Sequence, residues 1–262
     1  MTARARSLER TLAERLIGGK TMSSTKAQRT SSMSFFTPAS IEVPAVTADQ
    51  MPEIDRIAME ETGPNLFQMM ENAGRNLAEM TLECLGGNWR QARIVVLAGT
   101  GGNGGGGIAA ARHLANHGAG VELCLAAPDK LGEIPAWQYK IFRSTGGKEV
   151  WPRDLDEEAD LIILDALIGY SLQSAPRGVF ADLIAWANSA GAPILSLDVP
   201  SGMDSTTGET PGNFIQATWT MSLALPKTGA GVGQGGPSCT GRHRHTPRDI
   251  PANRLDVCAS FW

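Results

Sequence analysis

From residue 93 onward, apolar positions follow two patterns that alternate along the chain. Short continuous apolar runs, such as Leu161-Ile162-Ile163-Leu164, alternate with stretches in which apolar residues recur every three or four positions. The first pattern is typical of strands buried on both faces, and the second of amphipathic helices. We therefore expect strands at 93–98, 121–126, 160–165, 193–198 and 218–225, and helices at 107–117, 135–144 and 179–190.

Two further helices are predicted before the first strand. Thr47 is a suitable N-cap for a helix that runs to about Glu61 and is ended by Gly63-Pro64. The second helix carries an apolar stripe made of Leu66, Met69, Met70, Ala73, Leu77 and Met80. Strand–helix alternation with short loops predicts a doubly wound α/β sandwich with a parallel sheet, which these two helices precede.

Ligands of such sheets bind where the strands end, and the first of these ends is rich in glycine. Residues 99–107 hold seven glycines among nine residues, together with Asn103. We expect a loop here, whose exposed N–H groups favour an anion together with the N-terminus of the following helix. It is not a Walker loop, because no Lys-Ser/Thr pair follows. A dehydrogenase site is disfavoured as well, because strand 121–126 has no acidic residue at its end.

Aspartates close two other strands, Asp165 after Leu164 and Asp198 after Leu197. A carboxylate at the end of a buried strand is costly unless it is paired, bound to a cation or open to solvent. Two such neighbours repel each other, and a cation between them or a proton on one of them resolves the conflict. Ser201 follows in a turn, and the polar segment 169–178 can line a pocket. An alternative also stays open, in which each aspartate only caps a turn.

Composition narrows the class of protein. The 262 residues are 42% hydrophobic and 19% charged, as in an ordinary globular protein. A net charge of -4 argues against nonspecific binding to nucleic acid, and no apolar run approaches the ~20 residues that span a membrane. The four widely spaced cysteines indicate reduced thiols and a cytoplasmic location, or a mitochondrial one in a eukaryote. His113 and His117 have no third ligand in view, so we expect them to lie on the surface or to pack in the core rather than to bind metal.

The N-terminal stretch 1–45 differs from the rest in being basic and rich in Ser, Thr and Arg, with no apolar period. We expect a disordered tail, or a start site placed too early with Met22 or Met33 as the true start. A mitochondrial transit peptide is the alternative, which Glu9 and Glu14 disfavour.

Six segments together resemble the YjeF N-terminal domain family, the NAD(P)H-hydrate epimerases, whose animal relative is the apolipoprotein A-I-binding protein. The resemblance covers about residues 45–235 and indicates a domain at 46–237. The segments occur in the family's order and spacing: Met70-Glu71-Asn72-Ala73-Gly74, the glycine-rich segment with Asn103, Ala111-Arg112-His113-Leu114, Asp165-Ala166-Leu167-Ile168-Gly169, Asp198-Val199-Pro200-Ser201-Gly202-Met203-Asp204 and Ala224-Leu225-Pro226-Lys227.

The resemblance implies a Rossmann-like three-layer sandwich, usually dimeric, that interconverts the R and S forms of hydrated NADH or NADPH. A separate dehydratase would then consume the S form. It also implies a potassium ion held by Asn103, Asp165 and Ser201, with Asp198 as the best-placed general acid/base. The implied substrate contacts are Gly102, Asn103, Gly104, Gly105, Gly106, Gly169, Tyr170, Ser171, Leu172, Gln173, Ser174, Ala175 and Asp198.

Two departures from the family pattern bear on function. The family commonly reads G-N-N-G-G-D-G where this chain has Gly102 and Gly106 in place of the first Asn and the Asp. The alternative function is therefore a non-catalytic module that binds a nucleotide or a protein. Residues 238–262 also depart, in a manner that indicates a frameshift near residue 238. We expect a terminal strand to be lost there, which would leave a sheet edge unfilled.

Overall fold

A computed structural model describes residues 34–36, 42–156, 161–231 and 255–258 of the chain. Its centre is a seven-stranded sheet in the order β5-β4-β3-β6-β7-β8-β9, in which every neighbouring pair is parallel. The strands are β3 (Arg93–Ala98), β4 (Gly120–Leu125), β5 (Lys148–Val150), β6 (Leu161–Ala166), β7 (Ile194–Leu197), β8 (Trp219–Leu223) and β9 (Leu255–Cys258). The predicted parallel sheet is confirmed, and β5 and β9 are additions to the five predicted strands.

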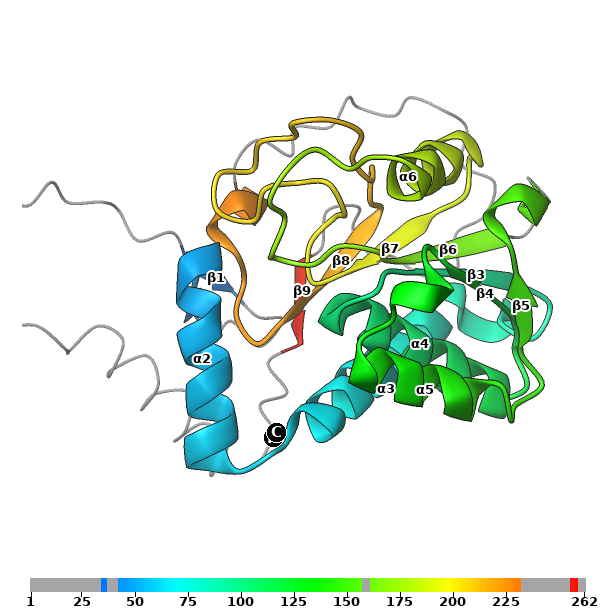
Figure 1. Ribbon diagram of the computed structural model, residues 1–262, viewed down its shortest axis with the longest axis horizontal. Coiled ribbons are helices and arrows are strands. Elements are labelled where there is room, and N and C mark those ends of the chain that lie inside the picture. The colour runs from blue at the N-terminus through cyan, green and yellow to red at the C-terminus, as the bar shows by residue number, and fades with distance from the viewer. Residues whose placement is uncertain (1–33, 37–41, 157–160, 232–254, 259–262) are drawn as a thin grey trace, which may run out of the picture.

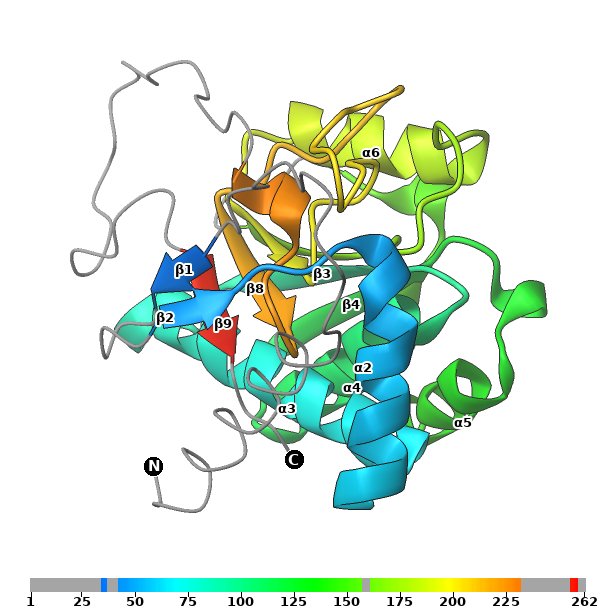
Figure 2. The same ribbon diagram turned by 90° about the vertical axis from the view of Figure 1, so that its left-hand side faces the viewer.

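Helices cover both faces of the sheet, so the fold is the predicted three-layer sandwich. One face carries α3 (Leu66–Leu85), α4 (Gly102–Asn116) and α5 (Glu133–Phe142), and the other carries α6 (Val179–Ser189). Figures 1 and 2 show these two helical layers from two directions, with α6 on the far side of the sheet from α3, α4 and α5. Short helical turns join the elements: η3 (Gly86–Asn88), η4 (Pro128–Lys130), η5 (Pro152–Asp154) and η6 (Thr228–Gly231).

The continuous apolar runs form strands because each strand is buried from both sides. In β3, Ile94 and Val96 pack in the core under α3, α4 and α5, whereas Val95 and Leu97 pack in the core under α6. All four side chains are completely buried. Because the side chains on both faces of this strand meet helices, neither face is polar. The sequence of the strand therefore does not alternate between apolar and polar residues.

The strand order places a ligand crevice between β3 and β6. From β3 the chain moves outward to β4 and β5, and it then returns to the other side of β3 to form β6, β7 and β8. The segments that follow β3 and β6 therefore diverge toward opposite layers, which opens a crevice at their carboxyl ends.

The glycine-rich segment is helical rather than a loop. The helix expected at 107–117 begins five residues earlier, so α4 includes Gly104, Gly105, Gly106 and Gly107. Glycine is a poor helix former in isolation, and the expected loop rested on that propensity. Tertiary packing overrides it here, because the glycines let α4 lie directly on neighbouring backbone and side chains. A Cβ on Gly104 would lie 2.0 Å from the carbonyl oxygen of Gly99.

The first predicted helix is present as three consecutive pieces: η1 (Ala48–Gln50), α2 (Met51–Ile57) and the π-helical turn η2 (Ala58–Thr62). Gly63, with a φ of 95°, ends the last piece. The second predicted helix is α3, which starts at a capping box between Asn65 and Gln68. Figure 1 shows α2 standing apart from the layer formed by α3, α4 and α5.

A third, smaller apolar cluster holds α2 in place. Met51 and Ile54 of α2 pack with Val43, Val46 and Leu225. Val46 also forms a parallel bridge with Lys227, in which Thr228 N donates to Val46 O at 2.9 Å. The N-terminal segment is therefore attached to the loop after β8, next to the carboxyl ends of the sheet.

Parts of the two predicted tails are ordered elements. Within 1–45, β1 (Ser34–Phe36) and β2 (Glu42–Pro44) form an antiparallel ribbon. The expected loss of a terminal strand is wrong, because β9 pairs with β8 along four residues and occupies that edge. The remainder of both tails, including the suspected frameshift and the two candidate start residues, lies outside the described residues.

Candidate active site

A cavity of about 1070 Å³ opens at the crevice between the ends of β3 and β6. Its walls come from α2, α3, the first turn of α4, the start of α5 and the segments after β6, β7 and β8. Pockets for drug-sized ligands measure about 300–1000 Å³, so this one accepts a ligand as large as a dinucleotide. The predicted substrate contacts that line it are Gly102, Asn103, Gly169, Tyr170, Ser171, Leu172, Gln173, Ser174, Ala175 and Asp198.

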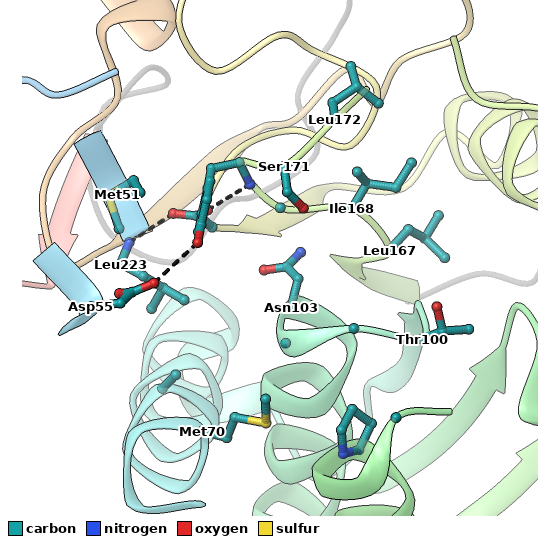
Figure 3. A pocket seen from close by; sticks show the side chains of 18 of the residues that line it. Met51, Asp55, Met70, Thr100, Asn103, Leu167, Ile168, Ser171, Leu172 and Leu223 are labelled. Atoms are coloured by element: carbon teal, nitrogen blue, oxygen red, sulfur yellow. Dashed lines mark hydrogen bonds between the residues drawn. The ribbon is translucent and has the colours of Figure 1, made fainter. Parts of the chain in front are cut away.

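Asn103 presents an unpartnered amide to this cavity. Its side chain projects from the first turn of α4 (Figure 3), and both amide atoms are buried without a hydrogen-bond partner among the described residues. A buried polar group left unpaired costs about 1–3 kcal/mol. Gly169 keeps the adjoining space open, since a Cβ there would lie 3.3 Å from both Asn103 Cγ and Asp198 Oδ2. The amide is therefore available to a ligand.

Asp165 and Ser201 join the ends of β6 and β7 beside the cavity. The fully buried Asp165 accepts hydrogen bonds from Ser201 Oγ at 2.5 Å, Ser201 N at 2.9 Å, Ser196 Oγ at 2.8 Å and Leu167 N at 3.2 Å. Burial raises the pKa of Asp165, and these bonds oppose the shift. No lysine or arginine within the described part of the chain forms an ion pair with it.

Ser201 also holds the segment after β6, which includes Gly169 beside Asn103. Its Oγ accepts a hydrogen bond from Ile168 N at 2.8 Å, one residue before Gly169. The structure thus brings two of the three predicted metal ligands, Asp165 and Ser201, into direct contact, and it places Asn103 against the same segment through Gly169. Neither Asp165 nor Ser201 lines the cavity itself.

Asp198 lies on the cavity wall in a strained and highly bonded position. Its φ of 72° is in the left-handed region, which non-glycine residues seldom occupy and which often marks a functional position. Its carboxylate forms an ion pair with Lys227 Nζ and accepts hydrogen bonds from Tyr170 N at 3.1 Å and Leu223 N at 3.4 Å. Lys227 is fully buried and also donates to Leu223 O at 2.8 Å. Sequence reasoning quoted Lys227 within a motif but gave it no role.

Asp55 is a second carboxylate on the cavity wall, which sequence reasoning missed. It projects from α2 toward the cavity (Figure 3) and accepts a hydrogen bond from the hydroxyl of Tyr170 at 3.2 Å. Burial raises the pKa of Asp55, and the Tyr170 bond and the charge of Lys227 partly oppose the shift. The only available sequence signal was a charge between Ile54 and Ile57, beside the apolar stripe of that helix.

The charges around the cavity are unevenly distributed. Among the described residues that line it, Asp55, Glu133 and Asp198 are acidic and Arg177 is basic. Arg177 is exposed, and no carboxylate in the described part of the chain forms a salt bridge with it. A guanidinium without a partner on a cavity wall is a suitable contact for an anionic group of a ligand.

Comparison with known proteins identifies the family. Residues 66–229 match the family described as "YjeF-related protein N-terminus". The chain belongs to this family. It is 52% identical over 198 residues to the "NAD(P)H-hydrate epimerase" of Dehalogenimonas lykanthroporepellens, which covers 75% of this chain and 80% of that protein.

Other members of the YjeF-related family extend the comparison. The chain is 36% identical over 232 residues to the "Bifunctional NAD(P)H-hydrate repair enzyme Nnr" of Salinibacter ruber, and the match spans 82% of this chain but only 42% of that longer protein. The crystal structure of yeast ynu0, YNL200c, superposes with a TM-score of 0.63 at 26% identity, over 71% of this chain and 82% of that one.

The glycines of this family member divide into two groups. Gly102 lies on the cavity wall, whereas Gly104, Gly105 and Gly106 are buried inside α4 and do not line the cavity. A Cβ on Gly105 would lie 2.4 Å from Met70 Sδ, and one on Gly106 would lie 2.9 Å from a terminal methyl of Leu197. Three of the predicted substrate contacts therefore serve close packing of α4 in this structure.

His113 takes a structural place between α3 and α4, whereas His117 is exposed. His113 Nε2 lies 2.8 Å from Glu71 Oε1, beside the salt bridge between Glu71 and Arg112 that joins α3 to α4. Burial lowers the pKa of His113. No group of three or more His, Cys, Asp or Glu side chains in the described ranges could hold a metal ion. Cys84 and Cys124 are free and buried. None of the described helices is long and apolar enough to cross a membrane.

Proposed function

We propose that this chain is an NAD(P)H-hydrate epimerase, which interconverts the R and S forms of hydrated NADH and NADPH. The observation that carries the proposal is a dinucleotide-sized cavity at the switch point of the sheet, with Asp198 and the unpartnered Asn103 on its wall. The relatives named NAD(P)H-hydrate epimerase, at up to 52% identity, support the same assignment.

The anionic part of the substrate has two complementary partners. The first turn of α4 begins at Gly102, and its N-cap, Gly101, has no side chain to cap it, so the N–H groups of this turn suit a phosphate. Arg177 supplies a positive charge on the cavity wall. We place the pyrophosphate between these features and the hydrated nicotinamide ring near Asp198.

The reaction is the chemistry of a carbon that carries both a hydroxyl and the ring nitrogen. Either the hydroxyl leaves and water returns, or the carbon–nitrogen bond opens and closes again, and both routes need a general acid/base. Asp198 is the proposed group, because Lys227 and two backbone N–H groups orient its carboxylate on the cavity wall. Such a positioned group typically contributes about 10²–10⁴-fold to the rate.

A potassium ion is the proposed cofactor, held by oxygens of Asn103, Asp165 and Ser201. The donors suit a hard cation, since all are oxygens. The unpartnered amide of Asn103 and the buried Asp165, which neutral donors alone surround in the described residues, both favour such an ion. The ion would supply positive charge that anchors the strand ends and offsets the phosphates. Replacing potassium by sodium or choline should lower the melting temperature of the wild type but not that of Asn103→Ala. Equal melting temperatures of the wild type in all three salts would refute the site.

We also propose that a separate dehydratase consumes the S product and that the chain forms a homodimer. The chain spans 42% and 40% of two longer relatives, each named "Bifunctional NAD(P)H-hydrate repair enzyme Nnr". Sedimentation of the purified protein tests the dimer directly.

The competing function is a module that binds nucleotides without catalysis. The observation that favours it is that Gly102 and Gly106 stand where the family commonly has Asn and Asp. The deciding experiment supplies purified R-hydrate to this protein together with a dehydratase specific for the S form, and it follows the recovery of NADH. We expect faster recovery with the wild type than with Asp198→Asn. No acceleration by the wild type, with nucleotide still bound, would instead establish the binding module.

A further inference from the structure

We propose that Asp55 is a second catalytic residue of this site, which donates a proton to the hydroxyl that leaves the substrate while Asp198 serves the water that returns. This inference rests on the proposed epimerase function. It is carried by the geometry of Asp55, Tyr170 and Asp198 around one cavity.

Tyr170 connects the two carboxylates. Its backbone N–H donates to Asp198 Oδ2 at 3.1 Å, and its phenolic hydroxyl donates to Asp55 Oδ2 at 3.2 Å. The dashed line that ends on Asp55 in Figure 3 marks the second bond. One residue therefore orients two carboxylates that come from different elements, α2 and the end of β7, and both face the same space.

The position of Asp55 is built into the fold. Met51 and Ile54, on the same short helix, are buried against Leu225 in the third apolar cluster, to which Tyr170 also contributes. The bridge between Val46 and Lys227 ties the segment before α2 to the lysine that pairs with Asp198. The placement of one carboxylate is thus mechanically linked to that of the other.

The two carboxylates have different electrostatic surroundings. Asp198 forms an ion pair with the buried ammonium of Lys227. Asp55 forms no ion pair within the described residues, and the cation of its own helix, Arg56, is engaged by Glu53 and Glu60. Burial raises the pKa of Asp55, the Tyr170 hydroxyl and Lys227 act in the opposite direction, and the charge of Asp198 adds to the rise. A pair of carboxylates in unequal environments is the usual arrangement for one acid and one base.

Epimerisation uses such a pair because the hydroxyl must leave one face of the ring and return to the other. The Asp55 proton is transferred to the hydroxyl oxygen, the carbon–oxygen bond breaks with its electron pair, and water departs. The lone pair of the ring nitrogen forms a carbon–nitrogen double bond, whose positive charge the Asp198 carboxylate stabilises. Water then adds to the opposite face and gives one proton to Asp198. Proton exchange with solvent through the open cavity restores both groups, and the reverse reaction exchanges their roles.

The test compares wild type, Asp55→Asn, Tyr170→Phe and the control Asp49→Asn in the coupled assay. Asp49 is an exposed carboxylate in the same N-terminal segment that does not line the cavity. We expect Asp55→Asn to lower kcat by about 10²–10³-fold, with less than about a threefold change in KM and in the Kd for NADP⁺ measured by calorimetry. The control should match the wild type.

The pH profile separates a catalytic role from a structural one. A general acid acts only when protonated, so wild-type kcat should fall as the pH rises through the pKa of Asp55, and Asp55→Asn should lose that limb. Tyr170→Phe removes a hydrogen bond that lowers the pKa of Asp55, so it should move the limb to higher pH. Thermal unfolding of each variant shows whether it is folded.

The outcomes distinguish the two levels of the argument. A wild type that does not accelerate epimerisation, while still binding NADP⁺, overturns the proposed function and this inference with it. An active wild type whose Asp55→Asn variant keeps its kcat and pH profile, or loses only affinity, overturns the role of Asp55 alone.

Discussion

Replacing Lys227 by methionine tests the feature on which the site geometry depends most. The substitution keeps an unbranched side chain of similar length in a fully buried position, but it removes the positive charge that pairs with Asp198. Asp198 is only 4% exposed, so water cannot replace the lost ammonium without a change in structure. We therefore expect Lys227→Met to destabilise the folded protein.

The magnitude follows from burial and from the bonds that remain. Removing one partner of a buried ion pair costs about 3–5 kcal/mol. The N–H groups of Tyr170 and Leu223 still donate to Asp198 in the variant, at 3.1 and 3.4 Å, so we expect the lower end, about 3 kcal/mol. That loss changes the unfolding equilibrium by roughly a hundredfold. It lowers the melting temperature by about 6–12 °C for a chain of this size.

Urea unfolding followed by circular dichroism measures the effect, with Asp198→Asn and the double variant completing a thermodynamic cycle. In the double variant no unpaired charge is left, so we expect it to be more stable than Lys227→Met alone. The reasoning is refuted if Lys227→Met costs less than about 1 kcal/mol, or if the double variant loses the sum of the two single losses.

Three further predictions address the helix, the substrate and the acid limb of stability. Gly104→Ala should lower the melting temperature by several degrees, because its Cβ would meet the Gly99 carbonyl oxygen at 2.0 Å. The control Gly102→Ala, whose Cβ would have a terminal methyl at 3.5 Å as its nearest neighbour, should change the melting temperature by no more than about 1–2 °C. Equal effects of the two substitutions would contradict the close-packing role of Gly104. Arg177→Gln should weaken NADP⁺ binding by about fivefold at low salt with little change in stability; calorimetry measures this, and an unchanged Kd would exclude Arg177 as a phosphate contact. Burial acts to raise the pKa of Glu71, but Arg112 and His113 hold that pKa below its ordinary value. The stability that ionised Glu71 contributes is therefore present at a pH above the ordinary pKa, and it is lost as the pH falls through the pKa of the folded state. The stability difference between wild type and Glu71→Gln should shrink on acidification in urea titrations, and a difference that is constant with pH would contradict the assignment.

The sequence alone predicted the framework of the molecule. Apolar runs such as 161–164 form strands buried on both faces, and the strand ends carry Asp165 and Asp198. These predictions succeed because hydrophobic period and strand length are local properties of the chain. The general rule that ligands bind at strand ends then predicts the position of the cavity from the sequence alone.

The glycine-rich segment shows where local reasoning fails. Seven glycines in nine residues predict a loop by intrinsic propensity, yet α4 begins at Gly102. The helix forms because its glycines allow backbone to approach Gly99, Met70 and Leu197 more closely than a Cβ would permit. Met70 and Leu197 are distant from these glycines in the sequence, and the chain folds back to bring Gly99 against α4. The positions of these three partners, which only the tertiary structure sets, decide that the segment is helical.

The pattern of apolar and polar residues by itself determined five of the seven strands in the described sheet, the helices that cover them, and Asp165 and Asp198 at the strand ends. The tertiary structure alone decided which other residues join them: the buried Lys227 pairs directly with Asp198, and Tyr170 links Asp55 of α2 to Asp198. No local pattern encodes that meeting, because residues 55 and 227 are far apart in the sequence. The fold brings them together through the bridge between Val46 and Lys227 and the packing of Met51 and Ile54 with Leu225. A charge beside an apolar stripe becomes part of a site only when the fold buries it next to another charge.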